Sequence, residues 1–141
     1  MRIFKSIVIG DRYLQRWYLI PRNPIFNVYL HRFEGSDDDR ALHDHPWHSL
    51  SILLKGRLRE YVFSNALPPG KMIEIRHPSR FLPVFRPANH AHRLELIEGP
   101  AWTIFITGPR FRQWGFHCPN GWRHWRNFTD ASGLRAGRGC E

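Results

Sequence analysis

Short runs of β-branched and aromatic residues recur along this chain, and most of them end at proline or glycine. The 141 residues include 11 prolines and 11 glycines, which leaves few stretches long enough for a regular helix, because proline breaks helices and glycine weakens them. Short apolar runs between turn residues are typical of the strands of a sandwich or barrel. The sequence therefore predicts an all-β fold, with strands at 16–20, 25–33, 49–54, 57–63, 71–76, 92–97, 102–107 and 122–128.

The connections between these strands can also be predicted. Lys55-Gly56 is expected to form a tight hairpin between two strands. Proline and glycine at 65–71 and 98–102 indicate further turns. Only residues 10–17 have the composition of a short helix.

The length of the chain is that of one domain. We expect a folded domain at residues 1–131 and a flexible, glycine-rich polar tail at 132–141. An aromatic content of 14% argues against disorder. No apolar run approaches the ~18 residues of a membrane span, and the first residues lack a signal peptide. Two cysteines are too few for a disulfide framework. Together these features predict a cytoplasmic protein.

The formal net charge is +9 and is carried mostly by arginine. Such a charge suits anionic partners. The basic residues are spread along the chain without a contiguous block, so an anionic small molecule is a better expectation than nucleic acid. A solvated basic surface explains the charge equally simply.

The sequence feature that most directly indicates a functional site is two pairs of histidines, each pair with one intervening residue. His43 and His45 form the first pair, and His90 and His92 form the second. Side chains two apart in a strand share a face, so each pair could present two imidazoles to one ion. We expect a metal site at His43, His45 and His92. His48 and His90 are each open to three roles: ligand, hydrogen-bond partner of a ligand, or substrate contact.

The remaining histidines have no such pairing. His31, His77, His117 and His124 are expected to be ordinary surface or core residues.

The residues around the two histidine pairs resemble the two motifs of the cupin family. The segment HDHPWHSLSILLKG (43–56) resembles the first motif, with its H-x-H at His43 and His45 and its closing glycine at Gly56. The segment PANHAH (87–92) resembles the second, with Pro87 and His92 in place. Ser49 occupies the glutamate position of the first motif. The chain is also similar to small cupin-like proteins, often phage- or prophage-encoded, that carry LHDHPW.

This resemblance implies a single-domain cupin jelly-roll barrel that pairs as a homodimer. It implies a divalent metal, with Fe(II) favoured and Zn, Ni or Mn as alternatives. Without the family's glutamate, the expected site has three histidines. The expected activity is that of a dioxygenase or hydroxylase acting on a small anionic metabolite, with Arg59, Tyr61 and Arg93 contacting the substrate.

Two other functions fit the same residues. One is a non-catalytic cupin that binds a sugar, a nucleotide or nucleic acid around a structural metal. The other is a metal-dependent isomerase or epimerase, with His48 or His90 as general base.

Overall fold

A computed structural model describes residues 6–9, 14–35, 42–63, 73–118 and 121–129. Within these ranges the chain forms ten strands and one four-residue helix, so the predicted all-β fold is confirmed. No helix of the described part is long and apolar enough to cross a membrane. In chain order the elements are β1 (Ser6–Ile9), β2 (Leu14–Tyr18), β3 (Asn27–Phe33), β4 (Leu42–His43), β5 (Ser49–Phe63), β6 (Ile73–Arg76), β7 (Val84–Arg86), β8 (His92–Thr107), β9 (Gly115–Cys118), β10 (Gly121–His124) and α1 (Trp125–Phe128).

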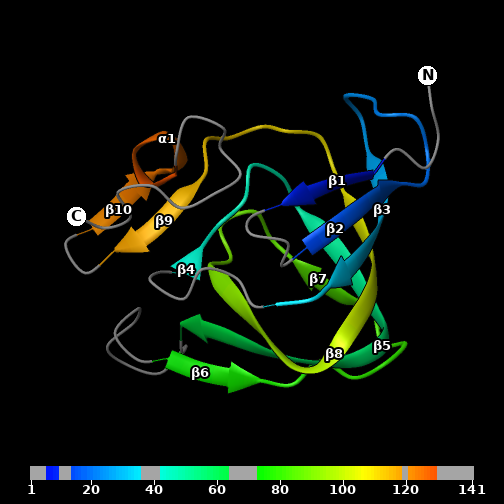
Figure 1. The fold of residues 1–141 in the computed structure, drawn as a ribbon. Coiled ribbons are helices and arrows are strands. Elements are labelled where there is room, and N and C mark those ends of the chain that lie inside the picture. The colour runs from blue at the N-terminus through cyan, green and yellow to red at the C-terminus, as the bar shows by residue number, and fades with distance from the viewer. Residues whose placement is uncertain (1–5, 10–13, 36–41, 64–72, 119–120, 130–141) are drawn as a thin grey trace.

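The strands form one continuous, antiparallel sheet that curls around a central space (Figure 1). Its hydrogen-bonded order is β1-β2-β3-β8-β4-β9-β10, and β5 joins it by pairing with β6, β7 and β8. The two longest strands, β5 and β8, pair with each other along most of their lengths. Because both strands bend, their two halves contribute to opposite sides of the curled sheet (Figure 1).

The predicted hairpin at Lys55-Gly56 is wrong, because β5 runs through it without reversing. The pairing of β5 with β8 shifts register between Leu53 and Leu58, and Gly56 has a φ of 84°. These irregularities bend the strand where glycine tolerates a left-handed backbone. The predicted turn at 98–102 is also wrong, because β8 runs through this segment without reversing. The segment pairs with the bent part of β5.

Two other predicted elements differ from the observed ones in type or in length. The helix expected at 10–17 is wrong, because residues 14–17 belong to β2 and alternate between the two faces of the sheet. The strand expected at 122–128 ends at His124, whose side chain accepts a hydrogen bond from the backbone N–H of Arg126 and begins α1. Residues 10–13, the turn at 65–71 and the tail at 132–141 lie outside the described residues.

Two groups of buried side chains stabilise the sheet. The first consists of Leu14, Phe33, Leu53, Leu58 and Ala101. The second joins β9 to α1 through Phe116, Cys118 and Phe128. Four members of the first group, Leu14, Phe33, Leu53 and Leu58, also line a cavity within the sheet, together with other aromatic residues, histidines and arginines.

Candidate metal centre

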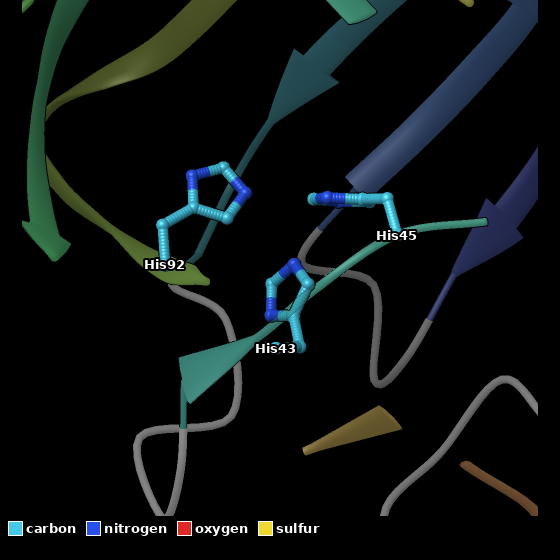
Figure 2. Close-up of side chains that lie close together, drawn as sticks. All are labelled: His43, His45 and His92. Atoms are coloured by element: carbon cyan, nitrogen blue, oxygen red, sulfur yellow. The ribbon is translucent and has the colours of Figure 1, made fainter. Parts of the chain in front are cut away.

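Three histidines from two chain segments lie close together (Figure 2), and all three line the cavity. His43 ends β4, His45 follows it, and His92 begins β8. The short β4 pairs with β8 so that His43 lies directly opposite His92. One ring nitrogen of each histidine lies within 4.8 Å of one ring nitrogen of each of the others. This is the arrangement needed for three imidazoles to bind one metal ion.

The aspartate between the first two histidines fixes their segment from behind. Asp44 is buried and accepts hydrogen bonds from the backbone N–H of Gly115 (2.8 Å) and from the side chains of His117 and Trp122 (3.0 Å each). Burial alone would raise the pKa of Asp44, but these hydrogen bonds and the charge of Arg112 lower it. Asp44 is therefore an anion that attaches the H-x-H segment to β9 and β10, while the two imidazoles face the cavity.

A buried glutamate orients the third histidine. Glu60 is 2% exposed, and its Oε2 lies 2.5 Å from Nδ1 of His92 and 2.6 Å from Nε of Arg86. Burial would raise the pKa of Glu60, but the histidine and arginine contacts lower it well below its usual range. The ionised carboxylate accepts a hydrogen bond from Nδ1–H of His92. This leaves Nε2 as the nitrogen that can bind a metal, an orientation common among metal-bound histidines.

Burial holds two of the three imidazoles, those of His45 and His92, in the neutral form that a metal requires. Burial lowers the pKa of His45 well below its usual value, and the neighbouring histidines and Arg86 lower it further. Burial also lowers the pKa of His92 to about 3, although the contact with Glu60 opposes the change. Both rings are therefore neutral at pH 7, so a metal would displace no proton from them.

The cavity beside the histidines has a volume of about 380 Å³. Its lining includes four arginines and the three clustered histidines, but no aspartate or glutamate among the described residues. Arg86 is neutralised by Glu60, whereas Arg22 and Arg110 are exposed. The aromatic and aliphatic part of the lining comprises Leu14, Tyr18, Tyr29, Phe33, Trp47, Leu53, Leu58, Leu82, Val84, Leu94, Phe105 and Trp114. Such a cavity suits an apolar or aromatic ligand that carries negative charge.

The structure separates the two remaining candidate histidines from the cavity. Nδ1 of His48 accepts a hydrogen bond from the backbone N–H of Ala88 at 2.9 Å, which connects the segments that carry the clustered histidines. Nε2 of His90 lies 3.5 Å from Glu60 Oε2 and has no hydrogen-bond partner in the described part of the chain. Glu60, His90 and His92 form a second cluster of ligand atoms within 4.8 Å of one another. Neither His48 nor His90 lines the cavity.

The three expected substrate contacts lie on the other face of the sheet. Arg59 forms an ion pair with Glu95 at 2.9 Å, and Tyr61 donates a hydrogen bond to the same carboxylate. The guanidinium of Arg93 lies 3.9 Å from the centre of the Tyr61 ring. None of these three residues lines the cavity, because the strand alternation turns their neighbours Leu58, Glu60 and Val62 inward instead.

Sequence reasoning missed Glu60, because the family motif directed attention to Ser49. Ser49 is buried at the start of β5, and its hydroxyl makes no hydrogen bond within the described residues. A signal for Glu60 was nevertheless present in the segment RLREYVF. Leu58 and Val62 share a face of this strand, so Glu60 between them had to point into the core, where a carboxylate needs partners.

Comparison with known proteins supports the fold. No family model and no curated protein matches the sequence. Among solved structures, an RmlC-like cupin from Shewanella frigidimarina superposes with a TM-score of 0.54 at 18% identity, covering 75% of this chain and 84% of that one. Streptomyces PAC13 with uridine gives 0.56 at 12% identity, covering 87% and 86%. The Fe(II) form of HppE gives 0.54 at 12% identity, covering 74% of this chain but 55% of that one.

These neighbours identify the class of fold. The chain has the jelly-roll fold of these cupin structures, which is the fold that the resemblance of its histidine motifs implied. Its three-histidine cluster lies in the cavity of that fold.

Proposed function

We propose that this protein is a metal-dependent enzyme in which His43, His45 and His92 hold one divalent metal ion. The observation that carries the proposal is the approach of three ring nitrogens to within 4.8 Å of one another on the wall of a cavity. We favour Fe(II) and a dioxygenase or hydroxylase reaction, with Zn, Ni and Mn as alternatives. The similarity in fold to the Fe(II) form of HppE supports iron chemistry in such a barrel.

The donor set explains why this chemistry suits the site. When bound, a metal with three neutral imidazoles retains its full charge and offers open positions for a substrate oxygen and for O₂. Glu60 holds His92 in the orientation that binding needs. The apolar side chains of the cavity limit the access of water.

The charge of the cavity supports an anionic substrate. Arginines line it and carboxylates do not, among the described residues. An anion would also offset the charge of a metal that has no carboxylate ligand. Because the histidine cluster and four arginines line a cavity of about 380 Å³, a small metabolite fits the proposal better than nucleic acid.

A non-catalytic, ligand-binding protein is the second candidate. PAC13 has the same fold and was solved with uridine, and the aromatic lining of the present cavity offers rings on which a base could stack. The isomerase hypothesis has less support, because His48 and His90 do not line the cavity. We propose a cytoplasmic location and a homodimer as the working state; light scattering after size-exclusion chromatography would give twice the chain mass of 16.8 kDa.

The deciding experiment compares metal content and O₂ uptake in two histidine variants. Protein purified without oxygen or chelator should contain about one iron per chain. The His92→Ala variant should lose the metal and any O₂ uptake with small anionic metabolites. The His77→Ala variant should keep both, because His77 is exposed and outside the cluster.

Three outcomes would contradict parts of this proposal. Wild-type protein that takes up no metal after adding Fe(II) or Zn(II) would overturn the metal site. Metal retained in His92→Ala would overturn the assignment of His92. A tightly held metal whose loss only lowers the melting temperature would favour the second candidate.

A further inference from the structure

The exposed part of the cavity lining marks the opening of the cavity. Among the described residues that line it, three are exposed to solvent: Arg22, Leu82 and Arg110. Arg22 lies in the connection between β2 and β3, and Arg110 follows the end of β8. Asn27 lies opposite Thr107 at the end of the β3–β8 pairing, so both segments leave the sheet at the same end. Two arginines therefore share the opening of the cavity.

The charges of these two arginines are not neutralised by the described part of the chain. Arg22 and Arg110 form no hydrogen bond and no ion pair with any described residue. The other two arginines of the lining have partners, since Arg86 contacts Glu60 and Arg16 contacts His31. No described aspartate or glutamate lines the cavity. Two like charges at one opening repel each other, and a bound anion relieves this repulsion.

The loop that carries Arg22 is held by its own hydrogen bonds. The backbone N–H of Asn23 donates to Oδ1 of Asn27 at 3.1 Å, and Nδ2 of Asn27 donates to the carbonyl oxygen of Asn23 at 3.0 Å. Oδ1 of Asn23 also accepts hydrogen bonds from the backbone N–H groups of Ile25 and Phe26 at 2.9 and 3.0 Å. Side-chain contacts of this kind fix the conformation of a connection. The backbone at Arg22 is therefore positioned before a ligand arrives.

The segment that carries Arg110 is attached to the backbone beside the histidine cluster. The backbone N–H of Phe111 donates to the carbonyl oxygen of Pro46 at 3.0 Å. The guanidinium of Arg112 donates to the carbonyl oxygen of His45 at 2.9 Å. These contacts flank Arg110 and fix its backbone relative to His45, one of the clustered histidines. A group bound by Arg110 is therefore held at a defined position relative to the cluster.

We propose that Arg22 and Arg110 bind the doubly charged phosphoryl group of a small substrate whose remainder enters the cavity toward the histidine cluster. Such a phosphoryl group offers two charges and three oxygens, whereas a carboxylate offers one charge and two oxygens. Two guanidinium groups without counter-ions match the phosphoryl group better. This inference rests on the proposed function only in calling the bound molecule a substrate. Because the arginines and the histidines are separate groups, the two proposals can be tested independently.

Two molecules that differ by one charge test the phosphoryl site. We would titrate Zn(II)-loaded protein with phenyl phosphate and with methyl phenyl phosphate by calorimetry, at pH 8 and low ionic strength. At this pH the first is doubly charged and the second singly charged, and the aromatic side chains of the cavity can contact the ring of each. Phenyl phosphate should bind at least about tenfold more tightly. A ratio of dissociation constants near one, or no binding of either molecule, would overturn the proposal.

Matched variants assign this preference to the two arginines. Arg22→Met and Arg110→Met should each lower the ratio at least about threefold, and the double variant should reduce it to near one. Arg57→Met is the control, because Arg57 is exposed but does not line the cavity, and it should leave the ratio unchanged. Circular dichroism checks that all variants are folded, which we expect because the replaced side chains are exposed. A ratio that survives the double substitution would overturn the assignment.

Titrations without metal distinguish the arginine site from direct binding of the phosphoryl group to a metal ion. In chelator-treated wild-type protein and in His92→Ala, the ratio should be kept and should still depend on Arg22 and Arg110. Loss of the ratio in both would show that the metal selects the doubly charged molecule, and would overturn the proposal.

The same measurements separate this inference from the proposed function. Persistence of the ratio in a protein that binds no metal after adding Fe(II) or Zn(II) would support the arginine site and reject the metal enzyme. A ratio near one in a protein that does bind metal would reject the arginine site alone.

Discussion

At the scale of single residues, Glu60 connects the stability of the core to the chemistry of the site. Its carboxylate contacts Arg86 on one side and His92 on the other, and all three side chains are buried. Because each partner of a buried charge depends on the others, a change at Glu60 affects both the fold and the third imidazole.

We expect Glu60→Gln to weaken zinc binding about 10- to 100-fold, because the neutral amide orients His92 less firmly than a carboxylate does. The affinity is measured by competition with a chromophoric chelator at pH 7. Glu95→Gln is the matched control, since Glu95 pairs with Arg59 on the outer face. Equal affinities for the wild type and Glu60→Gln would show that the carboxylate has no role in metal binding.

His31 gives a prediction about pH. Its pKa in the folded protein lies well below the usual 6.5, so the unfolded chain takes up the proton first. The contribution of His31 to stability is complete above the unfolded pKa and decreases as the pH falls below it. The decrease is at most about 1.4 kcal/mol per pH unit for one proton.

The pH effect is measured by urea unfolding of metal-free protein between pH 7.5 and 5. His45 and His92 add to the wild-type slope, because their pKa values are also lowered. In His31→Phe the free energy of unfolding should depend less steeply on pH, because one titrating histidine is missing. This decrease is expected even if the variant is less stable than the wild type at every pH. An unchanged slope would mean that His31 titrates normally in the folded protein.

At the scale of elements, the bend of β5 decides how the sheet curls. A Cβ atom on Gly56 would lie 2.6 Å from the Cα of Ala101, and Ala101 is fully buried. The bend therefore needs both a positive φ and the absence of a side chain. A hairpin at Gly56 would have made the two halves of β5 into two separate strands. The bend instead keeps them in one strand, in which Leu53 packs in a buried hydrophobic group and Glu60 contacts Arg86 and His92.

Gly56→Ala should lower the free energy of unfolding by at least about 2 kcal/mol, from the positive φ and the contact with Ala101 together. Gly121→Ala is the control, because Gly121 also has a positive φ of 126° but its Cβ would meet nothing within 4 Å. Thermal and urea unfolding of both variants separate the two contributions. Equal losses would show that close approach to Ala101 adds nothing.

At the scale of the whole molecule, the site joins segments that are distant in the sequence. His92 begins one long strand, Glu60 lies near the end of another, and His43 and His45 belong to a segment attached to β9 and β10 through Asp44. A metal bound here would therefore contact the curled sheet from several sides, and its binding energy would add to the stability of the fold.

We expect Zn(II) at one hundred times its dissociation constant to stabilise the protein by about 2.7 kcal/mol. For a chain of this size, the melting temperature should rise by roughly 5 to 10 °C, as measured by circular dichroism. His92→Ala should show no such rise, while His77→Ala should behave like the wild type. A similar rise in His92→Ala would place the metal elsewhere.

The sequence by itself determined the class of fold and the identity of the histidines that meet. Proline and glycine spacing argued against long helices, and the short runs of β-branched and aromatic residues between them indicated strands, because both follow from local backbone chemistry. The two histidine pairs indicated His43, His45 and His92 through the resemblance of their motifs. These features depend on neighbours along the chain, which a sequence shows directly.

The tertiary structure alone decided what surrounds those histidines. Whether the chain reverses or only bends at Gly56 depends on the pairing of β5 with β8. After the bend, the side chains of β5 alternate so that Glu60 points inward and Arg59 outward. The pairing of Arg16 with His31 likewise arises from the register of β2 against β3. Such contacts join residues far apart in the chain, and a shift of one residue would exchange the two faces of a strand.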